Sequence, residues 1–391
     1  MNNNTHGLEK DIARKMTAVR RSIHSNPELS HEETATAALV RHELEQAGIT
    51  DIEPVYETGL VATINGKHNG KTIALRGDLD ALPLTERTEL PFASTKPGVM
   101  HACGHDAHTA MVFATALTLH RERNTLRGTV RCIFQPAEEC EPLGGREVVR
   151  AGKIQGVDGV IGMHVDPALD VGKIAVREGA VNASADEFAI RIQGKSSHGA
   201  KPHLGVDTIS VAAALIQELQ KIPSRRIDPF TPALITVGKI EGGSAANIIA
   251  EDVTLHGILR TMDESARDAM RNMVREISDG VVGAHGASAE VSITEGEPVL
   301  RNDPHMTKLI REVGLELLGP ECVELATPSL GSDDFAFYAE QAPAVYFRLG
   351  VRNQKKGYVH PLHHPQFAID ENALDVGATV LIRAARRFLQ R

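Results

Sequence analysis

The sequence predicts an α/β fold in which a domain with a central, mostly parallel sheet is interrupted by a smaller inserted domain. Three observations carry this prediction. Helix and strand signals alternate over residues 60–165, a β-α-β-β-α-β order follows over 184–295, and helix and strand signals resume from 304. Such alternation favours a parallel sheet with helices on its faces, and the β-α-β-β-α-β order is the ferredoxin-like motif.

The first two predicted elements are helices, and strands follow them. Apolar residues recur every three to four positions from Leu8 to Ile23, which predicts a helix with one apolar stripe. Ser30 and Glu33 have the spacing of a capping box, so we expect a second helix that begins there and ends near Gly48. A helix is then expected at 107–121, between strands at 60–66, 71–81, 128–135 and 159–165.

The inserted domain is predicted from six elements with no long linker on either side. We expect helices at 206–222 and 264–280, and strands at 186–194, 233–240, 253–260 and 289–295. The C-terminal piece that follows is too short to form an independent domain and is expected to complete the first one, with elements at 304–318 (helix), 344–350 (strand) and from 371 (helix, capped by Asp370). The predicted domains are therefore 1–183 with 296–391, and 184–295.

The composition excludes several classes of protein. At roughly 100–200 residues per domain, a chain of 391 residues is expected to form two or three domains. The net charge of −9 argues against a surface that coats nucleic acid, and no run approaches the roughly 18 apolar residues of a membrane span. The N-terminus lacks the apolar segment of a secretory signal, and the four cysteines are too sparse for a disulfide scaffold. We therefore expect a soluble, cytoplasmic protein.

The densest cluster of metal-ligand residue types lies at a predicted strand-to-helix turn and reads His101-Ala-Cys103-Gly-His105-Asp106-Ala-His108. Cysteine and histidine are preferred donors for zinc-like ions. Four such residues within eight positions indicate a metal or catalytic site. The alternative is a glycine-containing loop with solvated histidines.

Further clusters follow other strand-like runs. Glu138 and Glu139 come after the strand at 128–135, and in an extended backbone their side chains point in different directions. One can then bind a metal while the other acts as a base, although a solvated turn is the alternative. Three further candidates remain. His164 lies at a predicted strand end, and His360, His363 and His364 lie in a loop with prolines. Asp78 and Asp80 are suited to orient a ligating histidine.

These clusters lie in motifs that resemble those of the M20 metallopeptidase family, and more narrowly its amidohydrolase branch of hippurate hydrolases, N-acyl-amino-acid amidohydrolases and auxin-conjugate hydrolases. The resemblance implies a catalytic domain with a dinuclear metal site, interrupted by a ferredoxin-like lid domain that commonly dimerises. We therefore expect a homodimer or tetramer formed through the lid, and neither nucleic acid nor membrane as a partner. The motifs occur in order, nearly end to end: RGDLDALPLTE (76–86), HACGHDAHTAM (101–111), FQPAEE (134–139), GMHV (162–165), SSHGAKPH (196–203) and GSDDFAFY (331–338).

The resemblance also implies roles for single residues. Two divalent ions per subunit are expected, and each is zinc, manganese, cobalt or nickel. The five expected ligands are Cys103, His105, Glu139, His164 and His363. Of these, Cys103 is expected to bridge both ions. His364 is the second choice in its loop. Glu138 matches the general base, and His198 matches a lid histidine that reaches an active site, in many members that of the partner subunit. Asn247 and Arg260 match residues that hold the substrate's carboxylate.

The expected reaction is hydrolysis of the amide bond of an N-acyl amino acid, either hippurate-like or N-acetylated, to a carboxylic acid and a free amino acid. Glu138 would take a proton from the attacking water and pass it to the leaving amine. The planar fork of Arg260 suits a carboxylate. Two alternatives stay open: a dipeptidase or carboxypeptidase of the same fold, and a metal- or ligand-binding paralogue without turnover.

Overall fold

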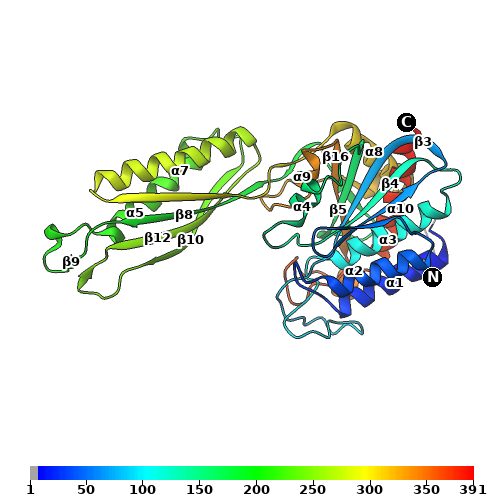
Figure 1. The fold of residues 1–391 in the computed structure, drawn as a ribbon, viewed down its shortest axis with the longest axis horizontal. Helices are drawn as coiled ribbons and strands as arrows, with labels where there is room; N and C mark the ends of the chain where they lie inside the picture. The colour runs from blue at the N-terminus through cyan, green and yellow to red at the C-terminus, as the bar shows by residue number, and fades with distance from the viewer. Residues whose placement is uncertain (1–7) are drawn as a thin grey trace. The chain divides into compact units, whose positions relative to one another are not determined.

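The computed structural model describes residues 8–391 and divides the chain into two compact units (Figure 1). Unit 2 comprises Ala180–Leu300 and Pro328–Asp333, and unit 1 comprises the rest. Three segments differ from the predicted boundaries, which placed them in the first domain: 180–183, 296–300 and Pro328–Asp333. The last of these lies far from the rest of unit 2 in the sequence. It belongs to unit 2 because the backbone N–H of Ala183 donates to the carbonyls of Ser329 and Gly331.

The strands of unit 1 are β1 (Ile52–Val55), β2 (Gly59–Asn65), β3 (His68–Asp78), β4 (Arg127–Gln135), β5 (Gly159–Asp170), β6 (Ile174–Val176), β15 (Val323–Leu325) and β16 (Ala344–Arg352). They form one eight-stranded sheet in the order β1-β2-β4-β3-β5-β16-β6-β15. The central pairs β4–β3, β3–β5 and β5–β16 are parallel, as is β6–β15. This sheet confirms the predicted mixed α/β fold class.

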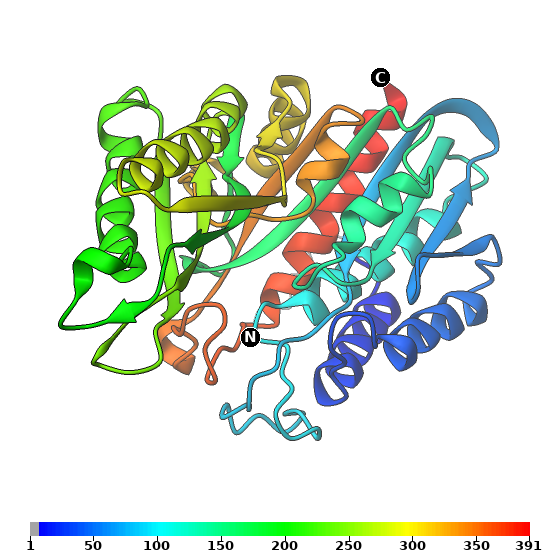
Figure 2. The same cartoon turned by 60° about the vertical axis from the view of Figure 1, so that its left-hand side comes forward.

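The helices of unit 1 are α1 (Lys10–Ser25), α2 (Thr34–Gln46), α3 (His105–Arg121), α4 (Gly144–Arg150), α8 (Pro304–Leu318), α9 (Ala336–Ala339) and α10 (Asn372–Gln390). Helix α3 is buried along almost its whole length, because its own alanines and larger apolar residues occupy every side of the helix. It packs against β3, α1 and α10, and Figure 2 shows α10 in red beside the sheet. Within residues 8–391, no helix is long and apolar enough to cross a membrane.

The capping box predicted for the second helix is wrong. The side chain of Glu33 makes no capping hydrogen bond, and the carboxylate of Glu28 accepts hydrogen bonds from the first turn instead. The hydroxyl of Ser30 donates to Asp80 over 2.7 Å, and Glu33 accepts a hydrogen bond from the backbone N–H of Ala137 over 2.7 Å. Both side chains therefore make long-range contacts that local spacing does not reveal.

Unit 2 has its own antiparallel sheet, built from β8 (Ser184–Gln193), β10 (Ala233–Gly242), β12 (Asp252–Thr261) and β13 (Ser288–Glu295) in the order β10-β12-β8-β13. The helices α5 (Thr208–Leu219) and α7 (Glu264–Ala284) cover one face (Figure 1). This arrangement has the predicted β-α-β-β-α-β order, and the helix expected at 206–222 ends early and is followed by the short α6 (Lys221–Arg225).

Short elements complete the description. The two-residue strands β9 (Ser197–His198) and β11 (Ile248–Ile249) pair with each other in unit 2. The strands β7 (Gly179–Asn182) and β14 (Leu300–Asn302) occur where the chain passes from one unit to the other.

Candidate metal centre

A glycine at the start of α3 brings the densest predicted cluster against strand β5. Cys103 and His105 flank Gly104, which caps α3 with a φ of +85°. A Cβ atom on Gly104 would lie 2.4 Å from Cγ2 of Val165, so a larger residue would push this loop away from β5. The close approach leaves Sγ of Cys103 only 3.3 Å from Nε2 of His164.

Cys103, His105 and His164 form the first group of candidate ligands. All three are buried, and their ligand atoms lie within 4.8 Å of one another. Nδ1 of His164 donates to the carbonyl of Val165 over 2.7 Å, which leaves the lone pair of Nε2 facing the group. Burial holds the pKa of His164 well below its usual value, so its ring stays neutral, the form that binds metals. Burial raises the pKa of the Cys103 thiol, so the thiolate form needs a cation beside it.

Cys103, Glu139 and His363 form the second group, and their ligand atoms also lie within 4.8 Å of one another. Nε2 of His363 is 3.3 Å from Oε1 of Glu139. The His363 backbone has a φ of +60°, and its N–H donates to the carbonyl of Ala102 over 2.9 Å. Cys103 belongs to both groups, which is the arrangement that a bridging thiolate requires.

The other histidine of this loop lies differently. The ring of His364 stacks on His360 with centroids 4.5 Å apart, and its Nδ1 accepts a hydrogen bond from the backbone N–H of Gln366. Among the described residues, His364 joins no group of candidate ligands. The geometry therefore favours His363 over His364.

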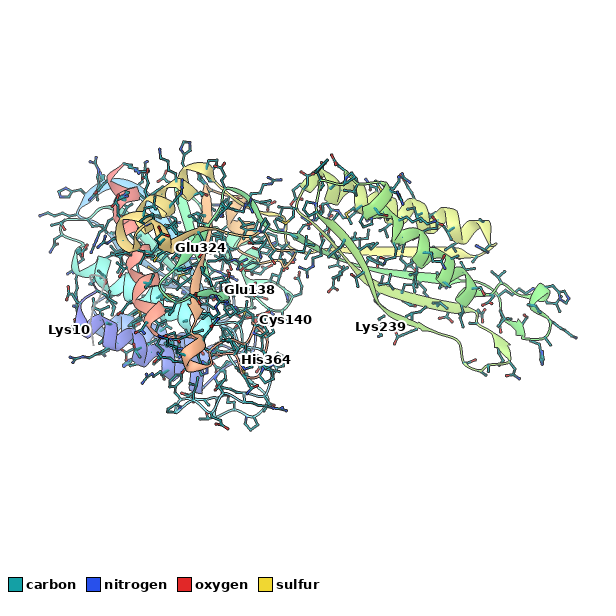
Figure 3. The ribbon with its side chains drawn as sticks, turned by 180° about the vertical axis from the view of Figure 1, so that it is seen from behind. Lys10, Glu138, Cys140, Lys239, Glu324 and His364 are labelled. Carbon is teal, nitrogen blue, oxygen red and sulfur yellow. The ribbon has the colours of Figure 1, made fainter. Side chains whose placement is uncertain are left out.

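Glu138 and Glu139 both face His105. Oε2 of Glu138 is 4.0 Å and Oε1 of Glu139 is 3.9 Å from Nε2 of His105, and Figure 3 labels Glu138 in unit 1. The prediction that the two carboxylates point in different directions is wrong. It assumed an extended backbone, whereas residues 138–140 form a bend after Ala137, which has a left-handed φ of +48°.

Asp80 connects two candidate ligands. Its Oδ1 accepts a hydrogen bond from Nδ1 of His105 over 3.1 Å, and its Oδ2 accepts one from the backbone N–H of Glu139 over 2.9 Å. Burial works against the charge of Asp80, but these hydrogen bonds and that of Ser30 hold its pKa below the usual value. The backbone carbonyl of Asp80 lies 2.9 Å from the same Nδ1. The carboxylate and the carbonyl of Asp80 therefore fix the ring orientation of His105 together, so that Nε2 faces the other ligands.

Asp78 has a different partner from the one expected. Its Oδ1 accepts a hydrogen bond from Nδ1 of His108 over 2.7 Å, and Arg76 donates to its other oxygen. Nε2 of His108 in turn accepts a hydrogen bond from the backbone N–H of Val165 over 3.0 Å. Asp78 therefore orients His108, which supports the strand that carries His164, and within residues 8–391 it makes no hydrogen bond to any of the five predicted ligands.

The donor set fits a cation. Nε2 of His105 is buried and has no hydrogen-bond partner in residues 8–391. Its nearest charged neighbours are the oxygens of Asp78, Glu139 and Glu138, at 3.7, 3.9 and 4.0 Å. A buried nitrogen without a partner is costly, and a divalent ion on this lone pair would satisfy it. Mixed sulfur, nitrogen and oxygen ligands suit zinc and the neighbouring transition metals.

Sequence reasoning missed a buried network beside the site. Asp106, which follows His105, accepts hydrogen bonds from Nδ1 of His24 over 2.8 Å and from Nε of Arg20 over 2.7 Å. His24 also contacts Glu86 over 3.2 Å. These partners are 82 and 86 residues from Asp106, so no local spacing pattern could have revealed them.

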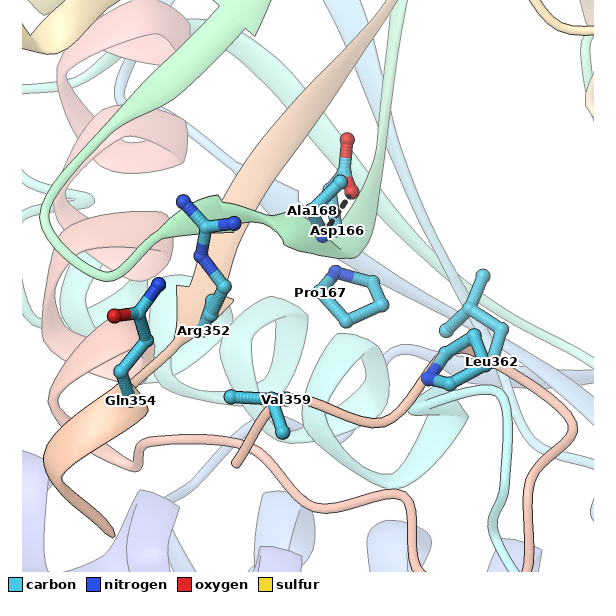
Figure 4. Close-up of a pocket in the computed structure, with 8 residues that line it drawn as sticks. Asp166, Pro167, Ala168, Arg352, Gln354, Val359 and Leu362 are labelled. Atoms are coloured by element: carbon cyan, nitrogen blue, oxygen red, sulfur yellow. Dashed lines mark hydrogen bonds between the residues drawn. The ribbon is translucent and has the colours of Figure 1, made fainter. Parts of the chain in front are cut away.

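A cavity of about 540 Å³ lies beside the segments that carry two candidate ligands. Its lining begins two residues after His164 and ends with Leu362, the residue before His363. Figure 4 shows Val359 and the guanidinium of Arg352 at its border. Most of the lining is apolar, and it consists of Asp166, Pro167, Ala168, Arg352, Gln354, Val359, Pro361 and Leu362.

Three predicted residues lie in unit 2. His198 on β9 pairs with Ile248 of β11, and the backbone N–H of Gly199 donates to the carbonyl of Asn247 over 2.7 Å. His198 and Asn247 are therefore close neighbours, and both are exposed. Arg260 lies on β12 and is half-buried. The catalytic and binding roles of all three remain predictions.

Comparison with known proteins decides the family. Residues 74–387 match the peptidase family M20/M25/M40. The chain belongs to this family. It is accordingly a hydrolase, as predicted, and its M20 relatives include proteins named as a deacetylase and an amidohydrolase.

Two relatives and one solved structure illustrate the range within the M20 family. The chain is 38% identical over 382 residues to the N-acetyl-L-cysteine deacetylase of Bacillus subtilis, covering 97% of this chain and 89% of the relative. It is 38% identical over 382 residues to thermostable carboxypeptidase 2 of Saccharolobus solfataricus, and the match covers 97% of this chain and 96% of the relative. The crystal structure of Bacillus subtilis YXEP, described as a dinuclear metal binding peptidase from the M20 family, superposes with a TM-score of 0.86 at 36% identity, covering 98% and 99%.

Proposed function

We propose that this M20 hydrolase cleaves the amide bond of N-acyl amino acids and releases a carboxylic acid and a free amino acid. The observation that carries the proposal is the pair of ligand groups that share Cys103, with Glu138 beside them at 4.0 Å from His105. A relative named for deacetylation of N-acetyl-L-cysteine supports the substrate class.

The five residues Cys103, His105, Glu139, His164 and His363 would hold two divalent ions. Bound ions of this kind lower the pKa of water and polarise a carbonyl oxygen. Glu138 lies outside the two groups that share Cys103. Its carboxylate takes a proton from the attacking water and delivers it to the nitrogen of the leaving amine.

Three residues of unit 2 have proposed roles in the reaction. His198 stabilises the negative charge that develops on the carbonyl oxygen, and Asn247 and Arg260 hold the carboxylate of the amino acid. Unit 2 forms the contact between the subunits of a homodimer. A cytoplasmic location suits the site, because a reducing compartment protects the Cys103 thiolate.

The cavity beside β5 suits the acyl group. Its lining is mostly apolar, and ligand pockets commonly combine apolar walls with a few polar groups. Its lining includes residues two positions after His164 and one position before His363 in the sequence.

The test compares substrates and two glutamate variants. We expect the enzyme, reconstituted with zinc, manganese, cobalt or nickel, to hydrolyse N-acetyl and N-benzoyl amino acids. Glu138→Gln should keep two metal ions per subunit by elemental analysis but lose roughly 10²–10⁴-fold in kcat, the usual contribution of a general base. Glu141→Gln, an exposed glutamate of the same loop, is the matched control and should keep wild-type activity. Wild-type turnover in Glu138→Gln would contradict the assigned base.

A carboxypeptidase is the second candidate, because a relative with 38% identity carries that name. The two functions differ in the group attached to the scissile amide. Rates of hydrolysis of an unblocked dipeptide and of its N-acetylated form distinguish the two functions. Preferential cleavage of peptide bonds over the N-acyl bond would favour the carboxypeptidase.

A further inference from the structure

A chain of hydrogen bonds inside unit 2 holds the guanidinium of Arg260. Nη1 of Arg260 donates to the hydroxyl oxygen of Ser332 over 2.9 Å and to the carbonyl of Leu330 over 3.4 Å. The hydroxyl of Ser332 donates to Oε1 of Glu297 over 2.8 Å. Because an ionised carboxylate only accepts hydrogen bonds, the serine proton points to Glu297 and the oxygen lone pairs face Arg260.

Backbone hydrogen bonds hold Glu297 and the loop that carries Ser332. The carbonyl of Glu297 accepts a hydrogen bond from the N–H of Ala185 over 2.9 Å. The loop that carries Ser332 is held by two hydrogen bonds from the N–H of Ala183, each 3.1 Å long. Burial raises the pKa of Glu297, and the Ser332 hydrogen bond and the charge of Arg260 oppose this shift. These two contacts offset part of the cost of burying the carboxylate.

This arrangement leaves one edge of the Arg260 fork for a ligand. In the part of the chain that the structure describes, Nε and Nη2 of Arg260 make no hydrogen bond. A guanidinium binds a carboxylate best through two parallel N–H donors. Fixing the side chain beforehand reduces the conformational entropy that is lost when the ligand binds.

We propose that Ser332 and Glu297 position Arg260 to receive the carboxylate of the amino-acid part of the substrate. They thereby determine a preference for N-acyl amino acids whose carboxylate is ionised over those in which it is amidated. This inference rests on the proposed function. Ser332 and Glu297 are positioning residues, because they act through Arg260.

The experiment compares an N-acetyl amino acid with its carboxamide in the metal-loaded enzyme. Ser332→Ala should raise KM for the acid by about tenfold, the order expected from losing a hydrogen bond to a charged group, with kcat changed less than about twofold. The carboxamide should keep its wild-type KM, or its inhibition constant where it is not cleaved. Ser332→Thr retains the hydroxyl and should restore the KM for the acid. Glu297→Gln should shift KM for the acid in the same direction.

Ser329→Ala is the matched control, because its hydroxyl lies in the same loop and accepts a hydrogen bond from the N–H of Gly331. It should leave both constants at their wild-type values. An equal loss for acid and carboxamide in Ser332→Ala, or no loss for the acid, would overturn the inference.

The outcome also separates this inference from the proposed function. A wild-type enzyme that hydrolyses no N-acyl amino acid contradicts the proposed function. In that case, calorimetry measures the Kd of the acid and of the carboxamide for the wild type and for Ser332→Ala, and the two ligands are compared as above. If the wild-type enzyme is active and Ser332→Ala has wild-type KM values for both the acid and the carboxamide, only the positioning role is contradicted.

Discussion

At the scale of single residues, hydrogen bonds around the proposed ligands decide what the site can bind. A histidine offers a lone pair at one nitrogen only when the other carries the proton, and its partner fixes that choice. Asp80 does this for His105, and the carbonyl of Val165 does it for His164. Ser30 and the backbone of Glu139 hold Asp80 itself. The ligand geometry therefore depends on residues that would not touch the metal.

Asp80→Asn tests this dependence. We expect metal affinity to fall by about 10–100-fold, the usual effect of losing an outer partner of a ligand, because asparagine lacks the charge that holds the His105 proton. Isothermal titration with Zn²⁺ or Mn²⁺ measures the effect. Ser30→Ala removes only one hydrogen bond to Asp80 and should lower affinity less. Equal affinity in Asp80→Asn and the wild type would show that Asp80 does not orient a ligand.

At the scale of elements, the site forms where strands end and α3 begins. The parallel strands β3 and β4 end together, with Asp78 paired to Gln135, whereas β5, which pairs with β3, continues to Asp170. Ligands gather at such strand ends in sheets of this kind. Gly104 allows α3 to begin against β5, because it adopts a left-handed conformation and has no Cβ to meet Val165. Cys103 and His105 are consequently held against His164.

Gly104→Ala should disrupt the metal centre. The left-handed conformation costs an alanine about 1–2 kcal/mol, and the new Cβ would displace Val165 and hence His164. Gly98→Ala is the matched control, because Gly98 has a φ of +79° but no atom within 4 Å of its added Cβ. Both variants should lose unfolding free energy in urea, but only Gly104→Ala should lose bound metal. Full metal content in Gly104→Ala would contradict the role of this close approach.

At the scale of the whole molecule, each unit has its own hydrophobic core. The core of unit 1 lies between the large sheet and helices such as α3 and α10, and that of unit 2 lies between its four strands and the helices α5 and α7. All five proposed ligands belong to unit 1. Metal that binds only the folded form stabilises the unit that binds it, by about 2.7 kcal/mol at a concentration of 100 times Kd.

We therefore expect metal to act on one unit alone. Differential scanning calorimetry should show two transitions, and removal of metal by a chelator should lower the Tm of one and leave the other unchanged. Cys103→Ala, which removes the shared ligand, should abolish the chelator effect. A single transition, or an equal shift of both, would show that the units unfold together.

The sequence by itself determined the fold class, the order of the longer elements, the family and the candidate ligands of the proposed metal centre. It did not reveal short elements such as β1, α4, β6 and β15. These properties are local, because hydrophobic period distinguishes helix from strand and donor chemistry is visible within one short motif. Only the tertiary structure decided which partners these residues have. Ser30 and Glu33 make hydrogen bonds to Asp80 and Ala137 in place of the predicted cap. Glu138 and Glu139 lie in a bend of the backbone, and both approach His105. Likewise, Ser332 contacts Arg260 from a segment 72 residues along the chain, and Glu297, 37 residues from Arg260, contacts Ser332. Contacts over such distances depend on how strands and loops pack, which spacing along the chain does not encode.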